Sequence, residues 1–380
     1  MKNLFSVLAF ALCSATFFTA CENPANFNKD LSAVNAINVG KTTEIAQVGK
    51  IYVKDDFLYV NEARKGIHVI DNIDPSNPKI VDFIAIEGNL DIAMKGDYIY
   101  ADSYNHLWVQ NVKTKKVNII KNAFPSQKKR QEIAEQIAIT GKSDLMAIQT
   151  HGANPTTGTA GSMARFAIVD NVLYVIEENI LKVYDITDQE NPVFVRNAVM
   201  DGEVETIFPY QDKLFVGGTT GMYIYDNADP AQPKFLSKFE HLMACDPVAV
   251  DKDIAYITLR NGTPCRAQAD NLLQIVDVKN PKAPTLIKEY PMSNPHGLSI
   301  KDDVLYICDG DQGVKVFDVS DSKNIKTLSK LPEVSKAYDV INMHNEKHLI
   351  VVGKDGIYQY DNSNPKALKQ LSKLEIRKTS

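Results

Sequence analysis

Short apolar runs alternate with polar, proline-containing turns along most of this chain. The stretch "IHVIDNIDPSNPKIV" (67–81) reads as a strand, a turn bracketed by prolines and a second strand. Closely similar stretches follow as "LKVYDITDQENPVFV" (181–195) and "MYIYDNADPAQPKFL" (222–236). The pattern therefore indicates one structural unit that the chain repeats.

A triplet of an apolar, an aromatic and an apolar residue marks each unit, with isoleucine at the centre of the last copy. The centres are Tyr59, Tyr100, Tyr174, Phe215, Tyr256, Tyr306 and Ile350. Three of the intervals between centres are 41 residues, and the longest follow Tyr100 and Tyr256. We therefore expect seven units with two insertions.

Each unit holds four short apolar runs, and the second and third runs are apolar on both faces. A single four-stranded sheet cannot bury both of its faces, whereas seven sheets arranged radially can. The prediction is an all-β, seven-bladed β-propeller of four-stranded blades. A parallel β-helix is the alternative, but its coils are shorter than these units.

A short polar residue ends the third run of every unit. These residues are Asp71, Asn111, Asp185, Asp226, Asp277, Asp318 and Asp361. Such a side chain can accept a hydrogen bond from the backbone N–H two residues later, and a following proline fixes the direction of the chain. We therefore interpret the repeated turn as structural and not catalytic.

Both insertions are predicted on one face of the propeller. The longer, 121–163, joins blades 2 and 3, and the shorter, "RNGTPCRAQAD" (260–270), joins strands 2 and 3 of blade 5. A helix is expected to start near Pro125 and to end at Gly141. Because the loops of a repeat protein that carry insertions commonly form its binding face, we expect binding there.

The N-terminus has the features of an export signal. Residues 1–20 hold one lysine and a short apolar run, which is too short to span a membrane. The sequence Phe18-Thr19-Ala20-Cys21 resembles a bacterial lipobox, so we expect lipidation of Cys21, with ordinary signal cleavage as the alternative. The predicted domains are the signal at 1–20, a lipidated tether at 21–43 and the propeller at 44–380.

Composition is globular, with 44% hydrophobic and 23% charged residues and a net charge of −5. No basic cluster stands out except "KKR" at 128–130, which the expected helix would place on a solvated face. We therefore expect no nucleic-acid partner.

Three cysteines remain after the signal and the anchor. Cys245 and Cys265 would lie close together if strands 1 and 2 of blade 5 pair about Lys252, so we expect a disulfide between them. Cys308 is left over and is expected to be a small buried apolar residue. A Cys/His metal site is the alternative, but paired Cys-x-x-Cys spacing is absent from the sequence.

Charged residues are predicted where the first strand of each blade starts near the central axis, and in neighbouring loops. The candidate ligand-binding residues are Asp91, Arg165, Glu205, Asp246, Arg260, His296, Asp309 and Asp339. Carboxylates with a histidine could bind Ca²⁺ or another divalent cation. However, "DGDQG" (309–313) is only a fragment of a calcium loop, so no cofactor is assigned and the alternative is a polar, water-filled channel.

Several motifs resemble a known family. The phrases "HVIDNIDPSNP" (68–78), "QIVDVKNPKAP" (274–284) and "VKVFDVSD" (314–321) resemble the LVIVD repeat of bacterial and archaeal surface proteins. Others, such as "NPHGLSI" (294–300), resemble the lipoproteins of that family in Bacteroidetes-type envelopes. The resemblance implies a β-propeller on the cell envelope and supplies no catalytic residues.

Three functions follow as hypotheses. The first is a non-enzymatic envelope lipoprotein, anchored in the outer membrane, whose inserted face binds a protein or a glycan. The second is a metal-dependent hydrolase or lactonase acting at the mouth of the central channel through Asp246, His296 and Asp309. The third is a structural subunit of an envelope assembly. A Ser/His/Asp set, a phosphate-binding loop and a dinucleotide fingerprint are all absent from the sequence, which favours binding over catalysis.

Overall fold

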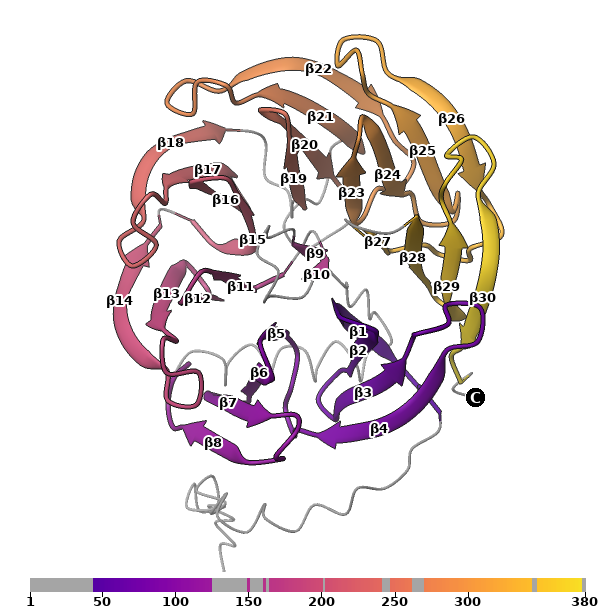
Figure 1. Ribbon diagram of the computed structural model, residues 1–380. Helices are drawn as coiled ribbons and strands as arrows, with labels where there is room; N and C mark the ends of the chain where they lie inside the picture. Colours follow the sequence, from indigo (N-terminus) through magenta and orange to yellow (C-terminus); the bar gives the residue numbers. More distant parts are fainter. Residues whose placement is uncertain are drawn as a thin grey trace, which may run out of the picture. The chain divides into compact units, whose positions relative to one another are not determined.

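Seven four-stranded antiparallel sheets form a ring, as the repeat predicts (Figure 1). A computed structural model describes residues 44–124, 149–150, 160–161, 164–200, 202–240, 247–261, 270–343 and 347–377. All of them lie in one compact unit, Val39–Ser380. Within these ranges there is no helix long and apolar enough to cross a membrane.

The four strands of each blade follow one another in chain order. Blades 1 to 3 consist of β1 (Val48–Lys54), β2 (Phe57–Glu62), β3 (Gly66–Asp71) and β4 (Lys79–Ala85); β5 (Ile92–Lys95), β6 (Tyr98–Ser103), β7 (His106–Asn111) and β8 (Val117–Ile120); and β11 (Phe166–Val169), β12 (Val172–Glu177), β13 (Ile180–Asp185) and β14 (Val193–Val199). Blade 4 consists of β15 (Val204–Tyr210), β16 (Lys213–Gly218), β17 (Gly221–Asp226) and β18 (Lys234–Glu240).

Blades 5 to 7 complete the ring. They consist of β19 (Val248–Asp251), β20 (Ile254–Leu259), β21 (Leu272–Asp277) and β22 (Thr285–Pro291); β23 (Leu298–Lys301), β24 (Val304–Cys308), β25 (Val314–Asp318) and β26 (Lys326–Leu331); and β27 (Asp339–Asn342), β28 (His348–Gly353), β29 (Gly356–Asp361) and β30 (Lys369–Glu375). The first strand of each blade lies near the central axis and the fourth lies at the rim (Figure 1).

The core lies between the sheets. The second and third strands are buried along most of their length, whereas the fourth strands are largely exposed or half-buried. Apolar side chains from neighbouring blades pack together, and one cluster joins Phe215 of blade 4, Ile275 of blade 5 and Ile307 of blade 6. Burial of both faces of each sheet is therefore what holds the ring together.

The turn between strands 3 and 4 has the predicted hydrogen bond in every blade. The polar residue that ends each third strand accepts a bond from the backbone N–H two residues later. The donors are the N–H groups of Ile73, Lys113, Thr187, Ala228, Lys279, Ser320 and Ser363. The hydrogen bond predicted for the repeated turn is therefore confirmed.

A serine in the fourth strand links some blades to the next turn. Ser237, Ser329 and Ser372 donate through Oγ to the carbonyls of Pro281, Pro365 and Pro75, each at 2.6 Å. The proline-containing turn therefore also serves as a contact between blades.

The ring closes between blades 7 and 1. The backbone N–H of Arg377 donates to the carbonyl of Ile45 at 2.7 Å. The Ile45 side chain is 1% exposed and packs in a cluster that contains Ile51 of blade 1 and Ile350 of blade 7. The closure therefore combines a backbone bond with a continuous apolar core.

Part of the long insertion reaches the centre of the ring. β9 (Gln149–Thr150) and β10 (Ala160–Gly161) pair as a two-stranded sheet that lies against β1, β15 and β27 (Figure 1). The expected signal, tether and lipidated Cys21, the expected helix at 125–141 and the cysteines Cys245 and Cys265 lie outside the described residues. Cys308 is fully buried, as expected, and forms no disulfide with the described part of the chain.

Candidate functional site

The pairing of strands 1 and 2 defines one equivalent position near the axis in every blade. The residue that follows the triplet centre in strand 2 pairs with a residue of strand 1, and the equivalent position is the residue just before that partner. In blade 1, Val60 follows Tyr59 and pairs with Ile51, so the position holds Lys50. In chain order these seven positions hold Lys50, Asp91, Arg165, Thr206, Pro247, Gly297 and Asp339. We call them the ring positions.

Charges alternate along one arc of the ring positions. From blade 7 through blade 3 the residues are Asp339, Lys50, Asp91 and Arg165, whereas blades 4 to 6 carry no charge there. Of the predicted site residues, Glu205 and His296 lie one residue before the ring position. The structure therefore groups three of the predicted residues with Lys50 and sets Glu205 and His296 apart.

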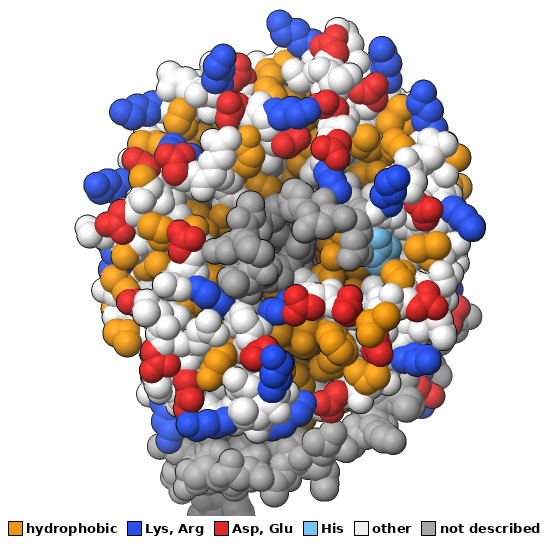
Figure 2. All heavy atoms as spheres, in the orientation of Figure 1, with side chains coloured by type: hydrophobic (Ala, Val, Ile, Leu, Met, Phe, Trp, Pro, Cys, Tyr) orange, Lys and Arg blue, Asp and Glu red, His pale blue; other side chains and the backbone are white. Residues whose placement is uncertain are grey.

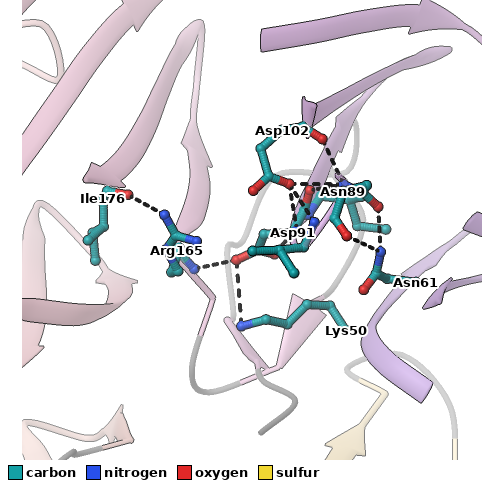
Figure 3. Close-up of polar contacts among 9 residues, drawn as sticks. Lys50, Asn61, Asn89, Asp91, Asp102, Arg165 and Ile176 are labelled. Carbon is teal, nitrogen blue, oxygen red and sulfur yellow. Dashed lines mark hydrogen bonds and ion pairs between the residues drawn. The ribbon is translucent and has the colours of Figure 1, made fainter. Parts of the chain in front are cut away.

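Asp91 lies at the centre of this arc (Figure 3). Its Oδ2 lies 3.6 Å from Nζ of Lys50 and accepts a hydrogen bond from the backbone N–H of Arg165 at 2.8 Å. The side chains of Lys50 and Asp91 are 9% and 2% exposed. One buried carboxylate therefore bridges blades 1, 2 and 3.

Asp102 supports the same region from the second strand of blade 2. Its Oδ1 accepts hydrogen bonds from the backbone N–H groups of Leu90 and Asp91, at 2.7 and 2.9 Å, and from the amide of Asn89 at 3.0 Å (Figure 3). The amide of Asn61 in blade 1 donates in turn to the Asn89 side chain. These bonds hold the connection between blades 1 and 2 against the inner strands.

In this network burial disfavours the charged forms of Lys50 and Asp102, and neighbouring opposite charges favour them. Burial lowers the pKa of Lys50, while Asp91 and Asp339 act in the opposite direction. Burial raises the pKa of Asp102, against the lowering effect of Arg165 and the two backbone N–H groups. A buried network of alternating sign satisfies its own charges, so its first role is to join blades.

His296 and Arg260 form a second contact, between blades 6 and 5. Nη1 of Arg260 donates to Nε2 of His296 at 3.3 Å, and Oγ1 of Thr258 donates to the His296 carbonyl at 2.7 Å. Arg260 is 5% exposed and His296 is 8% exposed. Burial, followed by the Arg260 charge, lowers the pKa of His296 from 6.5 to about 3, so the imidazole is neutral at pH 7.

Asp309, at the end of the second strand of blade 6, binds the connection that enters this blade. Its carboxylate accepts hydrogen bonds from the backbone N–H groups of Ser293, at 3.0 Å, and Asn294, at 2.7 Å, and forms an ion pair with Lys315. The side chain is fully buried. Asp309 therefore fixes the connection from blade 5 to blade 6 and has its oxygens occupied by protein groups.

The Asp309–Lys315 pair belongs to a recurring pattern that was not predicted. The same two strand positions hold Glu62 with His68, at 2.7 Å, in blade 1 and Glu177 with Lys182, at 2.8 Å, in blade 3. In blades 4 and 7 the acid is replaced by glycine and the base by tyrosine, as in the pair Gly218 and Tyr223 and the pair Gly353 and Tyr358. A residue-by-residue comparison of the repeats would have revealed this exchange.

The described residues do not assemble a metal centre. Among them, no group of three or more His, Cys, Asp or Glu side chains is placed to hold a metal ion. Asp246, which the metal hypothesis requires, lies outside the described residues.

Comparisons with known proteins agree with the fold. Residues 46–83, 265–291 and 295–326 match the LVIVD repeat. Comparison with curated proteins gives no match.

Solved structures of several other proteins are similar to this chain, and three of them illustrate the similarity. A protein from Lactobacillus plantarum is 12% identical, with a TM-score of 0.59 over 87% of this chain and 97% of that one. The computationally designed Ika8 protein is 13% identical, with a TM-score of 0.56 over 89% and 92%. BamB from Moraxella catarrhalis is 9% identical, with a TM-score of 0.53 over 83% and 84%. At this level of identity the likeness concerns the fold alone. The chain is therefore a seven-bladed β-propeller that carries LVIVD repeats.

Proposed function

We propose that the protein is a non-enzymatic binding module of the cell envelope. It binds a protein or a glycan on the face that carries both insertions, which we call the inserted face. A lipid on Cys21 holds it at the outer membrane, and the segment 21–43 serves as the tether. No nucleic-acid partner is proposed, because charges of both signs are interspersed around the ring (Figure 2).

The position of the long insertion is the observation that carries this proposal. Its β9–β10 pair lies against the inner strands of blades 1, 4 and 7, at the centre of the ring. The insertion in blade 5 follows strand 2 and therefore leaves the same face. A partner that docks on this face would meet both insertions and the loops around them.

The carboxylates near the axis are bound by groups of the protein itself, which also supports binding over catalysis. Asp91, Asp102 and Asp309 are engaged by backbone N–H groups or by cations of the protein. General acid–base or metal chemistry needs a carboxylate that can reach a substrate. The hydrolase alternative rests on Asp246, His296 and Asp309. Of these, His296 contacts Arg260, Asp309 is bound by backbone N–H groups and Lys315, and Asp246 lies outside the described residues.

A matched pair of substitutions tests the proposed face. Tyr104, 43% exposed, lies in the strand 2–3 turn of blade 2 on the inserted face, whereas Ile73, 69% exposed, lies in a strand 3–4 turn on the opposite face. The full-length protein in detergent is used to capture crosslinked partners from solubilised envelopes and to probe a glycan array. Tyr104→Asn is expected to weaken binding roughly tenfold, as loss of an aromatic contact does, and Ile73→Asn to leave it unchanged.

The choice of asparagine keeps the backbone conformation of Tyr104, whose φ is 54°. Empty results from both the envelope capture and the glycan array would contradict the proposal. Equal losses from the two variants would contradict the assignment of the face.

A further inference from the structure

The outer strand of blade 3, β14, exposes four large apolar side chains to solvent, beside the polar Arg196 and Asn197. Val193, Val195 and Val199 are 62%, 41% and 70% exposed, and Phe194 between them is 51% exposed. β14 lies at the rim and pairs only with β13 in the described part of the chain (Figure 1). Among the described strands, none pairs with the outer edge of β14, and such an edge is one to which a further strand can add.

Four of the other six blades protect this edge. Four outer strands begin with a lysine opposite the aspartate that ends strand 3: Lys79, Lys234, Lys326 and Lys369. In β14 the same position, opposite Asp185, is Val193. Lysine on an edge strand discourages strand addition, so β14 lacks a safeguard that four of its six sister strands have. The strands β8 and β22, which begin with Val117 and Thr285, lack it as well.

A second difference lies in the middle of the strand. Arg196 occupies the position at which blades 4, 6 and 7 have Ser237, Ser329 and Ser372, the serines that bond to the next blade. Arg196 is exposed and forms no ion pair with the part of the chain that the structure describes. The edge therefore presents one positive charge within an apolar strip.

We propose that β14 accepts an extended segment of a partner protein as a fifth strand of blade 3. The segment carries apolar residues opposite the valines and a carboxylate opposite Arg196. A second copy of this chain fits less well, because full antiparallel overlap of two β14 strands places Arg196 directly opposite its own copy. This surface is at the rim and is separate from the inserted face.

Synthetic peptides test the proposal. The probe is a fluorescent peptide of alternating valine and threonine with one central glutamate, and its control has lysine in place of glutamate. Fluorescence anisotropy measures binding to the full-length protein in detergent. The glutamate peptide is expected to bind at least about fivefold more tightly than the lysine peptide.

Val193→Lys gives β14 the residue that β4, β18, β26 and β30 have at this position and is expected to weaken binding of the glutamate peptide about fivefold or more, with circular dichroism unchanged. Val81→Lys makes the same change on β4, where the valine is 51% exposed, and should have no effect. Absence of binding, equal binding of the two peptides, or equal losses from both variants would overturn the proposal. A protein dimer that Val193→Lys dissociates would also overturn it, because the occupant would then be a second copy.

Discussion

At the scale of single residues, the same two positions on strands 2 and 3 are filled in one of two ways in five of the seven blades. Blades 1, 3 and 6 bury an acid with a base, whereas blades 4 and 7 combine glycine with tyrosine. A Cβ on Gly218 would lie 3.0 Å from the Tyr223 ring, so the tyrosine occupies the space that the acid fills elsewhere. A buried carboxylate without its cation is costly, so the two positions change together.

This exchange predicts how blade 3 responds to substitution. The side chains of Glu177 and Lys182 are 1% and 9% exposed. Lys182→Tyr removes the ion pair of Glu177 at 2.8 Å and should lower the free energy of unfolding by roughly 3–5 kcal/mol. The double variant Glu177→Gly with Lys182→Tyr has the residues of blade 4 and should be more stable than the single variant, as measured by denaturant unfolding. If the double variant is less stable than the single one, the two positions are not exchangeable as a pair.

At the scale of elements, the strand 3–4 turn depends on one acceptor oxygen. Oδ1 of Asp277 accepts a hydrogen bond from the N–H of Lys279 at 2.9 Å, and Asn111 makes the same bond in blade 2. Asp277→Ala should therefore lower the free energy of unfolding by about 1 kcal/mol, while Asp277→Asn should leave it nearly unchanged. Thermal and denaturant unfolding of both variants checks this, and a loss as large in the asparagine variant would mean that charge, not the turn bond, is required.

The strands and turns could be predicted from the sequence, whereas the contacts between them could not. Strand number, blade number and turn chemistry follow from local patterns, because alternation and turn residues act within a few positions. The residues at the ring positions were predicted less accurately from these local patterns. The pairing of strands 1 and 2 shows that Thr206 and Gly297 are the equivalent positions in blades 4 and 6, one residue after the predicted Glu205 and His296. The hydrogen-bond partners of Asp309 lie on the incoming connection, 15 and 16 residues earlier, where no local pattern points to them.

At the scale of the whole molecule, closure joins the two ends of the described chain. Besides the Arg377–Ile45 bond, Nε2 of Gln359 donates to Oδ1 of Asn72 at 2.8 Å, and Ser372 bonds to Pro75. Blade 7 therefore packs on blade 1 much as any blade packs on the next. Because every sheet needs a neighbour on each side, opening this junction would expose apolar surface on two blades at once.

Ile45→Ala tests whether the closed ring unfolds as one unit. Removing a fully buried isoleucine side chain down to Cβ should lower the free energy of unfolding by about 2–5 kcal/mol. The single tryptophan, Trp108, is buried in blade 2, so its fluorescence reports unfolding away from the junction, while far-UV circular dichroism reports all seven sheets. In a cooperative ring, Ile45→Ala shifts the unfolding transitions of both signals together to lower denaturant concentration. The control Val81→Ala, at an exposed site, should change the free energy of unfolding by no more than about 0.5 kcal/mol with either signal. An early loss of circular dichroism with Trp108 fluorescence unmoved would mean that blade 7 separates from blade 1 on its own, and that closure adds little to the rest of the ring.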